Sequence, residues 1–153
     1  MIEIWTDGSC NNNPKHANFG YGGWGYVMVK DGKVIHEDLG YDEQVTSQKM
    51  EMRAVIEGLK RVIDKYPKSR VTIVSDSAYI VNCFIERWYI RWEETDWYDV
   101  KNREYWEELL RLYRSKLVRV RFKKVRGHAG IELNERADFL AGEARKYIME
   151  QKL

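Results

Sequence analysis

Core-type and surface-type residues alternate over residues 2–10, which is the period of a β-strand. The run ends in Asp7, Gly8 and Ser9, a cluster typical of turns. The pattern therefore predicts a carboxylate at the tip of a strand, beside a glycine that lets a ligand approach the backbone closely. Taken alone, an aspartate in such a place is more often a turn or cap residue than a functional one.

The same alternation predicts two more strands, at residues 22–30 and 33–41. The pair Asp31-Gly32 between them favours a tight hairpin turn. Three consecutive strands joined in this order predict an antiparallel sheet. The polar segment 11–20, which contains Pro14 and three consecutive asparagines, is predicted to be a loop.

The hydrophobic period then lengthens to between three and four residues, which indicates an amphipathic helix over residues 47–66. Ser47 is predicted to cap this helix, and Pro67 lies just past its end. Glu51 falls at the edge of the apolar face near the helix start. Its carboxylate is therefore expected to be half buried.

Strand and helix patterns alternate in the rest of the chain. Residues 70–75 are rich in β-branched side chains, which predicts a central strand buried on both faces and ending at Asp76. Further helices are expected at 78–85, 101–115 and 134–149, and a last strand at 117–125. Asp138 is placed in the first turn of the last helix. Strands followed by strand–helix alternation predict an α/β fold with one mixed sheet.

Composition narrows the class of protein. A chain of 153 residues without linkers or repeats is predicted to form one domain, residues 1–153. The sequence has no run of about 18 apolar residues and no basic-then-apolar start, so neither a membrane span nor a signal peptide is expected. Cys10 and Cys83 lack metal-ligand or redox spacing and fit reduced thiols, although a disulfide stays open. The net charge of +2 is weak support for a polyanionic partner.

Four carboxylates stand at strand tips or near helix starts: Asp7, Glu51, Asp76 and Asp138. If the two strands are parallel neighbours, their carboxyl ends form an edge at which open α/β sheets bind ligands. Four acids there would repel one another, and bound divalent cations resolve such repulsion. Oxygen ligands without paired His or Cys favour Mg²⁺, or Mn²⁺, over Zn²⁺. Two such ions about 3.5–4 Å apart form the clamp used for in-line phosphoryl displacement.

The stretches around these acids carry a resemblance to a known family. They read T-D-G-S-C at 6–10, M-E-M-R-A at 50–54, S-D-S-A-Y at 75–79 and G-H-A-G-I-E-L-N-E-R-A-D at 127–138. In this combination and order the chain resembles cellular type 1 ribonuclease H, from about residue 2 to residue 145. The resemblance implies a ribonuclease H-like fold, with a five-stranded mixed sheet in the order 3-2-1-4-5 flanked by helices. It also implies an endonuclease that hydrolyses the RNA strand of RNA/DNA hybrids, leaving 5′-phosphate and 3′-hydroxyl ends.

Carried over by position, the resemblance implies that the four acids hold two Mg²⁺ ions, for which Mn²⁺ could substitute. It implies that His128, on a loop flanked by glycines, assists proton movement and product release, a task suited to an imidazole near pH 7. Because the 2′-hydroxyl separates RNA from DNA, contacts with the RNA sugars matter for specificity. The resemblance implies substrate contacts for Gly8, Ser9, Cys10, Asn13, Thr46, Gln48 and Trp88.

Within that set, Thr46 would belong to a pocket for a DNA phosphate, and Trp88 to a channel for the DNA strand. Trp92, Trp97 and Trp106 are expected to pack in the core instead. The basic protrusion of the family is shortened here and carries acids, namely Glu93, Glu94, Asp96 and Asp99. This change is expected to weaken binding of a polyanion. The bases available for compensation are Arg87, Arg91, Lys101 and Arg103.

Three other functions are compatible with such a fold. The chain could be the nuclease domain of a reverse transcriptase, although the start at Met1 and the self-contained helices argue against it. It could bind nucleic acid without cleaving it, but the complete acid set with His128 argues for chemistry. A transposase or integrase core would lack the G-H-A-G and N-E-R-A-D stretches. The leading hypothesis is a cytoplasmic, monomeric hybrid endoribonuclease.

Overall fold

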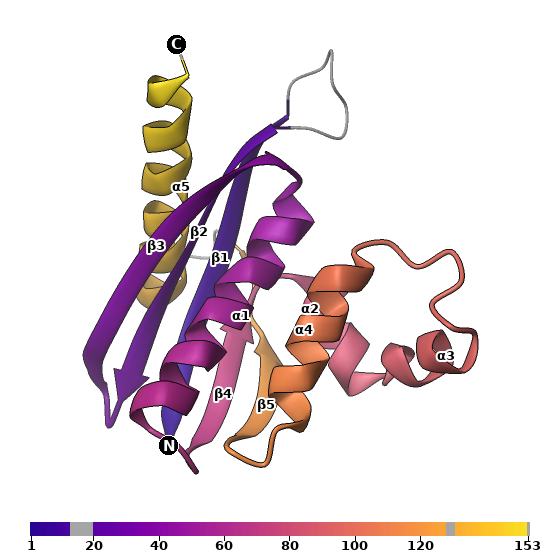
Figure 1. Cartoon of the computed structure of the whole chain (residues 1–153). Coiled ribbons are helices and arrows are strands. Elements are labelled where there is room, and N and C mark those ends of the chain that lie inside the picture. Colours follow the sequence, from indigo (N-terminus) through magenta and orange to yellow (C-terminus); the bar gives the residue numbers. More distant parts are fainter. Residues whose placement is uncertain (13–19, 128–130, 153) are drawn as a thin grey trace.

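A computed structural model describes residues 1–12, 20–127 and 131–152. Its strands are β1 (Ile2–Asn12), β2 (Gly20–Lys30), β3 (Lys33–Val45), β4 (Arg70–Ser75) and β5 (Arg119–Lys124). Its helices are α1 (Ser47–Lys65), α2 (Ala78–Ile85), α3 (Trp88–Glu94), α4 (Arg103–Arg114) and α5 (Glu132–Gln151). Figure 1 shows these elements in the colours of the sequence.

The five strands form one mixed sheet in the order β3-β2-β1-β4-β5, which confirms the predicted fold. β1, β2 and β3 pair antiparallel, whereas β1 with β4 and β4 with β5 pair parallel. At the β2–β3 hairpin Asp31 and Gly32 have φ angles of 51° and 77°. Two consecutive positive φ angles are typical of a two-residue hairpin turn, so this prediction is also confirmed.

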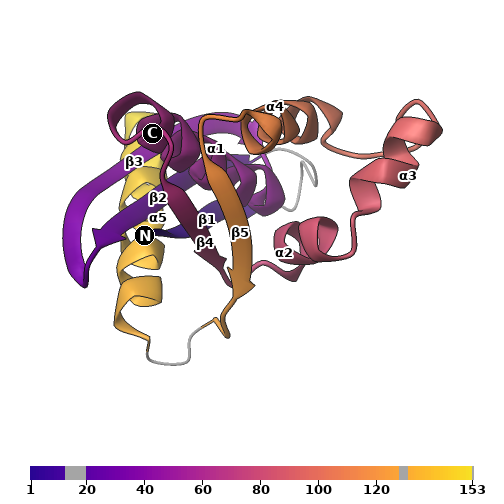
Figure 2. The ribbon, with the colours of Figure 1, turned by 90° about the horizontal axis from the view of Figure 1, so that it is seen from below.

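Helices cover the two faces of the sheet unequally. On one face α1 packs against β1 and β2, and α4 packs against α1. The larger core lies there and includes the fully buried side chains of Ile4, Val55, Ile73 and Trp106. On the other face α5 packs against β1, β2 and β3, as Figure 2 shows from below. A smaller core fills that contact, with Val27, Val29, Ala137 and Leu140.

The predicted starts of α1, α4 and α5 need correction, and α4 begins at Arg103 instead of residue 101. The cap of α1 is Thr46 rather than Ser47, because the Thr46 hydroxyl accepts a hydrogen bond from the Lys49 backbone nitrogen at 3.2 Å. Both residue types are good helix caps, so the sequence did not separate them. α5 begins two residues earlier than predicted, at Glu132, which places Asp138 in the second turn instead of the first.

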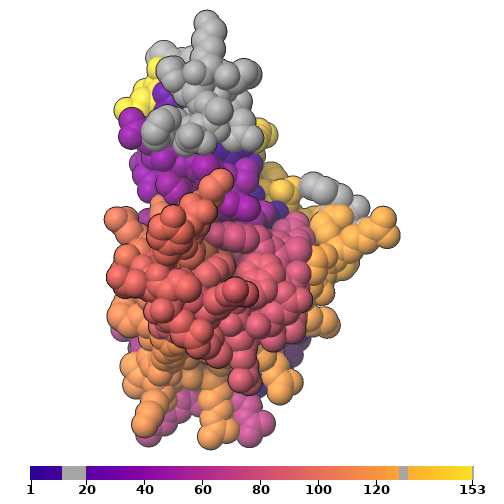
Figure 3. Space-filling model, turned by 90° about the vertical axis from the view of Figure 1, so that its right-hand side faces the viewer, coloured from indigo at the N-terminus to yellow at the C-terminus, as the bar shows by residue number. Residues whose placement is uncertain are grey.

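The α2–α4 segment stands out from the sheet and forms much of the face seen in Figure 3. Aromatic packing fastens it. Trp106 is fully buried, and its indole nitrogen donates to the Tyr79 hydroxyl at 2.8 Å. The Trp92 ring lies 5.3 Å from that of Trp106 and 5.9 Å from that of Trp97. Core packing of these three tryptophans is therefore confirmed, complete for Trp106 and partial for the other two.

A charge pair also fastens α3 to α4. The Arg114 guanidinium donates to both carboxylate oxygens of Glu93, at 2.6 and 2.7 Å. One of the acids predicted to repel substrate is therefore already neutralised. Arg103 likewise pairs with Glu107, so it is not a free compensating base.

The structure also bears on membrane-spanning helices and on a disulfide between the two cysteines. No helix in the described part of the chain combines the length and the apolar character needed to cross a membrane. Cys10 and Cys83 are both free thiols, so the disulfide left open by the sequence is not formed.

Candidate metal centre

Two acids come together because of strand register. Parallel β1 and β4 pair from Ile2 with Val71 to Trp5 with Val74. Each strand then reaches its acid two residues later, Asp7 on β1 and Asp76 just after β4. The carboxylates of Asp7 and Asp76 therefore meet just past the end of the parallel pairing, as predicted. Asp7 is not at a strand tip, however, because β1 continues through it to Asn12 in its pairing with β2.

A glycine brings the third acid to the same edge. A Cβ atom built on Gly8 would lie 2.2 Å from the backbone nitrogen of Glu51, so only glycine allows β1 and α1 to approach this closely. The close approach predicted at Gly8 is thus made by α1. The Gly8 backbone nitrogen also donates to Oδ1 of Asp7 at 2.9 Å, which fixes one oxygen of that carboxylate.

Asp7, Glu51 and Asp76 each offer a carboxylate oxygen within 4.8 Å of the other two. Asp7 is only 6% exposed, and the other two are half buried. Among residues 1–12, 20–127 and 131–152, this is the only group of three or more acids, histidines or cysteines close enough to hold a metal ion. A set of oxygen donors alone fits a hard divalent cation such as Mg²⁺.

The fourth predicted acid lies beside this acid group, which we define as Asp7, Glu51 and Asp76. Asp138 projects from α5, is exposed, and shares a hydrogen bond with the Asp7 side chain. Four elements that are distant in sequence thus bring their acids to one place.

Burial and the neighbouring charges make the carboxylates of Asp7 and Glu51 hard to ionise without a cation. Burial raises the pKa of Asp7 to about 8, and the charges of Asp76 and Asp138 add to this rise against the hydrogen bond from Gly8. Burial likewise raises the pKa of Glu51 to about 7, with a further contribution from Asp76. A bound cation would reverse the balance and favour the ionised forms.

Ser77 orients Glu51, a role that the sequence did not indicate. Its hydroxyl hydrogen-bonds the Glu51 carboxylate and thereby lowers the pKa of that group. The same hydroxyl oxygen accepts from the Ile80 backbone nitrogen at 3.3 Å and caps α2. A serine just before an apolar run is a typical helix cap, so the sequence indicates the capping role. The contact with Glu51 joins two distant segments and depends on the fold.

The chain after β5 touches the acid group as well. A Cβ atom on Gly127 would lie 2.8 Å from Oδ2 of Asp76, so this glycine packs directly against the carboxylate. The next residue is His128, and the predicted roles of His128 and Asn13 fall outside the described residues.

The other predicted substrate residues lie around the end of β1. Beyond Trp5, β1 pairs with β2 on one edge and no longer with β4, so Gly8, Ser9 and Cys10 follow Asp7 along an edge that no described strand covers. The Cys10 thiol donates to the Val45 carbonyl at 3.2 Å. Two polar candidates begin α1: Thr46 caps it and Gln48 is exposed in its first turn.

Trp88 stands farther away, at the start of α3. Its ring is half buried against the core, and its indole nitrogen donates to Glu86 at 2.7 Å. The ring lies 6.3 Å from that of Trp92, so it belongs to the same aromatic packing that fastens α3.

The chain matches known proteins over nearly its whole length. The family model described as RNase H matches residues 1–146. The chain is 40% identical over 151 residues to the ribonuclease H of Thermoanaerobacter sp. (strain X514), covering 95% of this chain and 90% of that protein.

Solved structures match it too. LC9-RNase H1, a type 1 RNase H with the type 2 active-site motif, is 28% identical with a TM-score of 0.79, covering 95% of this chain and 72% of that one. LC11-RNase H1, solved in complex with an RNA/DNA hybrid, has a TM-score of 0.74 at 24% identity, covers 97% of this chain and 99% of that one, and supports the fold alone.

Proposed function

Because the chain belongs to the ribonuclease H family, we propose that it hydrolyses the RNA strand of RNA/DNA hybrids at the acid group. The products carry 5′-phosphate and 3′-hydroxyl ends. The observation that carries the proposal is the group of three carboxylate oxygens within 4.8 Å of one another, just past the point where the parallel pairing of β1 with β4 ends. We place the proposed activity in a single ribonuclease H domain, residues 1–153.

The acid group, completed by Asp138, would hold two Mg²⁺ ions, or Mn²⁺ in their place. Bound there, the ions supply a water of lowered pKa and neutralise charge on the scissile phosphate. The protein fixes the ligands beforehand: the Gly8 amide holds one oxygen of Asp7, and the Ser77 hydroxyl orients Glu51. Such prior positioning is what a hydrolytic site contributes to the rate.

The remaining candidate residues divide the substrate between them. Gly8, Ser9, Cys10, Asn13 and Gln48 would contact the RNA sugars, whose 2′-hydroxyls identify the strand to be cut. Thr46 would bind a phosphate of the DNA strand near the start of α1. Trp88 would border the path of that strand, and His128 would move a proton and release the product.

The test is a comparison of three substrates. Purified protein is incubated with an RNA/DNA hybrid, duplex RNA and duplex DNA, each with Mg²⁺ and with EDTA. We expect cleavage of the hybrid alone, only with Mg²⁺, and end-labelling should find a 5′-phosphate on the fragment downstream of each cut and a 3′-hydroxyl on the fragment upstream. Equal cleavage of duplex DNA, or cleavage in EDTA, would refute the proposal.

We also propose that the protein acts as a cytoplasmic monomer. Its two thiols are free, as expected in a reducing compartment. Light scattering coupled to size exclusion should give the mass of one chain, 18.3 kDa.

A further inference from the structure

The face of the sheet that carries α5 is only partly covered. α5 packs against β1, β2 and β3, and Figure 2 shows β5 lying beyond its reach. Side chains alternate along a strand, and Val120 and Phe122 of β5 point to the larger core. Their neighbours Arg119, Arg121 and Lys123 therefore point to the uncovered face, and all three are exposed.

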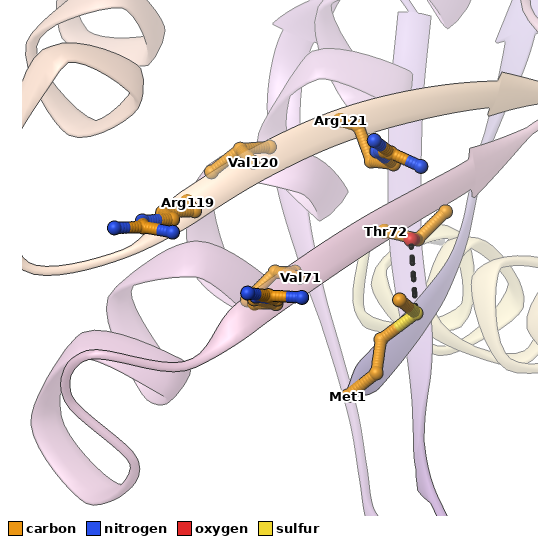
Figure 4. A pocket seen from close by; sticks show the side chains of 7 residues that line it. Met1, Val71, Thr72, Arg119, Val120 and Arg121 are labelled. Carbon is orange, nitrogen blue, oxygen red and sulfur yellow. Dashed lines mark hydrogen bonds between the residues drawn. The ribbon is translucent and has the colours of Figure 1, made fainter.

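These three cations, which we call the β5 column, are joined by an arginine of the adjacent strand. Arg70 pairs in register with Arg119, and it is exposed as well. Arg70, Arg119 and Arg121 line a hollow of about 320 Å³ together with Met1, Val71, Thr72 and Val120. Figure 4 shows Arg119 and Arg121 along β5 above Met1, whose sulfur accepts from the Thr72 hydroxyl.

No acid among the described residues neutralises the positive charge of the β5 column. None of its members, nor Arg70, forms an ion pair with any described residue, although ten ion pairs occur elsewhere in the same part of the chain. Arg121 is in register with Thr72 of β4, and Thr72 is in register with Glu3 of β1. The acid in this row across the sheet is therefore two strands away from Arg121. Its carboxylate is turned to the Trp5 indole nitrogen at 3.5 Å.

The β5 column points at the acid group. β5 runs parallel to β4, and its last residue, Lys124, pairs with Ser75, immediately before Asp76. Successive members of the column are two residues apart, roughly 6.6 Å along the strand, so the row extends about 13 Å from Arg119 to Lys123. A regular row of cations fits a ligand whose negative charges also repeat regularly, which is the property of a nucleic-acid backbone.

We propose that the β5 column binds the phosphates of a single-stranded extension of the hybrid substrate and leads that strand away from the acid group. All three cations lie on the single β-strand β5, so they form one narrow row. Such a row can contact the phosphates of one nucleic-acid strand but not both backbones of a duplex. The inference rests on the proposed function for the identity of the attached duplex. Binding of the strand itself does not depend on cleavage.

The experiment compares tailed and blunt hybrids in the Asp7→Asn background, which prevents cleavage. The tail is DNA of about ten nucleotides, within the site sizes of single-strand binding domains, and is placed at each end in turn. The Asp7→Asn protein without further changes, which we call the parent, should bind the hybrid tailed at one of its two ends several-fold more tightly than the blunt hybrid. Two added phosphate contacts should make the logarithmic salt dependence steeper by about 1.4.

The test variant is Arg119→Glu/Arg121→Glu, with Arg119→Gln/Arg121→Gln as a milder form should the reversal impair folding. The matched control is Lys33→Glu/Lys146→Glu, which changes the net charge equally at two exposed sites away from β5. We expect both test variants to bind the blunt hybrid as tightly as the parent does but to lose the increase in affinity that the tail gives. The control variant should keep the affinity for the blunt hybrid and the increase caused by the tail.

Several outcomes would overturn the inference. These are a tail that gives the parent no gain, a gain that survives in the test variants, and a gain that the control loses equally. Displacement of the tail by an acidic peptide at equal charge concentration would reassign the β5 column to protein partners. Failure of the proposed function would look different, because the blunt hybrid would then remain uncut by the wild-type protein whatever the tailed substrates show.

Discussion

Gly8 and Glu51 meet backbone to backbone, with 2.2 Å between the Glu51 nitrogen and the place where a Cβ atom of residue 8 would stand. This contact sets the distance between β1 and α1 and hence between the carboxylates of Asp7 and Glu51. The geometry of the acid group therefore depends on a residue that has no side chain.

The first prediction concerns this contact. Gly8→Ala should force α1 away from β1 and lower the free energy of unfolding by about 1–3 kcal/mol, the usual cost of overpacking. It should also weaken metal-dependent cleavage. Gly142→Ala is the control, because a Cβ atom there would meet nothing within 4 Å and the helix should gain up to about 1 kcal/mol. Urea unfolding measures the free energy of unfolding of each variant. Equal values for the two variants would show that the contact between Gly8 and Glu51 is not tight.

The second prediction concerns metal ligation. Asp7→Asn keeps the shape of the side chain but removes the most buried charge of the acid group. Mg²⁺-dependent cleavage of the hybrid should disappear while binding of the hybrid survives. Asp31→Asn makes the same atomic exchange at the exposed hairpin turn and should leave cleavage unchanged. Full activity of Asp7→Asn would remove Asp7 from the set of ligands.

The third prediction concerns stability without metal. The folded protein holds the pKa of Asp7 at about 8, above the roughly 4 of an unfolded chain, so the folded state binds the extra proton between these values. In EDTA the unfolding free energy should therefore fall as the pH rises from about 4 to about 8. Asp7→Asn should flatten this fall.

At pH 8 in EDTA, Asp7→Asn should melt higher by a few degrees, reflecting a gain on the order of 1 kcal/mol. Calorimetric scans at several pH values measure both effects. A parallel pH dependence in the two proteins would argue against a crowded acid group.

The fourth prediction concerns proton release. At pH 7 Asp7 and Glu51, with pKa values of about 8 and about 7, hold protons that a divalent cation must displace. Binding of Mg²⁺ should therefore release about one proton, and its affinity should rise with pH up to about 8. Titration calorimetry in buffers of different ionisation enthalpy counts these protons. Binding without proton release would show that the acid group is already ionised.

The fifth prediction concerns the acidic protrusion. Because Glu93 is held by Arg114, its reversal would break a bidentate pair, so Glu94 is the cleaner position. Glu94→Lys should tighten hybrid binding several-fold and steepen the logarithmic salt dependence by about 0.9 if one phosphate is contacted. Glu150→Lys, at an exposed position near the end of α5, is the control. An unchanged salt dependence would place α3 away from the substrate.

The sequence predicted most of the sheet because each strand has its own signal. Alternation marked β2 and β3, and β-branched residues marked β4 with its observed bounds of Arg70–Ser75. α3 was missed as a helix because its aromatic residues suggested a surface for stacking as much as packing. It also begins after Arg87 in a left-handed conformation, with no capping side chain to signal a start.

The acid group was predictable only in part, for a physical reason. The end of β4 before Asp76 was readable, but the turn-forming residues Asp7, Gly8 and Ser9 wrongly suggested that β1 ends there, whereas pairing with β2 carries it on to Asn12. The assumed parallel pairing of the two strands is what places Asp7 and Asp76 together. Contacts between distant segments are not readable in this way. The hydrogen bond from Ser77 to Glu51 and the packing of Gly127 on Asp76 exist only because the fold brings those segments together.

The two glycines that border the acid group also limit how the enzyme could be made more heat-resistant. Exchanging glycine for alanine often stabilises a protein by about 0.4–1 kcal/mol, because the unfolded chain loses freedom. At Gly8 and Gly127 that route is closed, since the new methyl group would displace a carboxylate of the acid group or the helix that bears one. Engineering for temperature should therefore leave the rim of the acid group untouched and begin on the outer surface of α5.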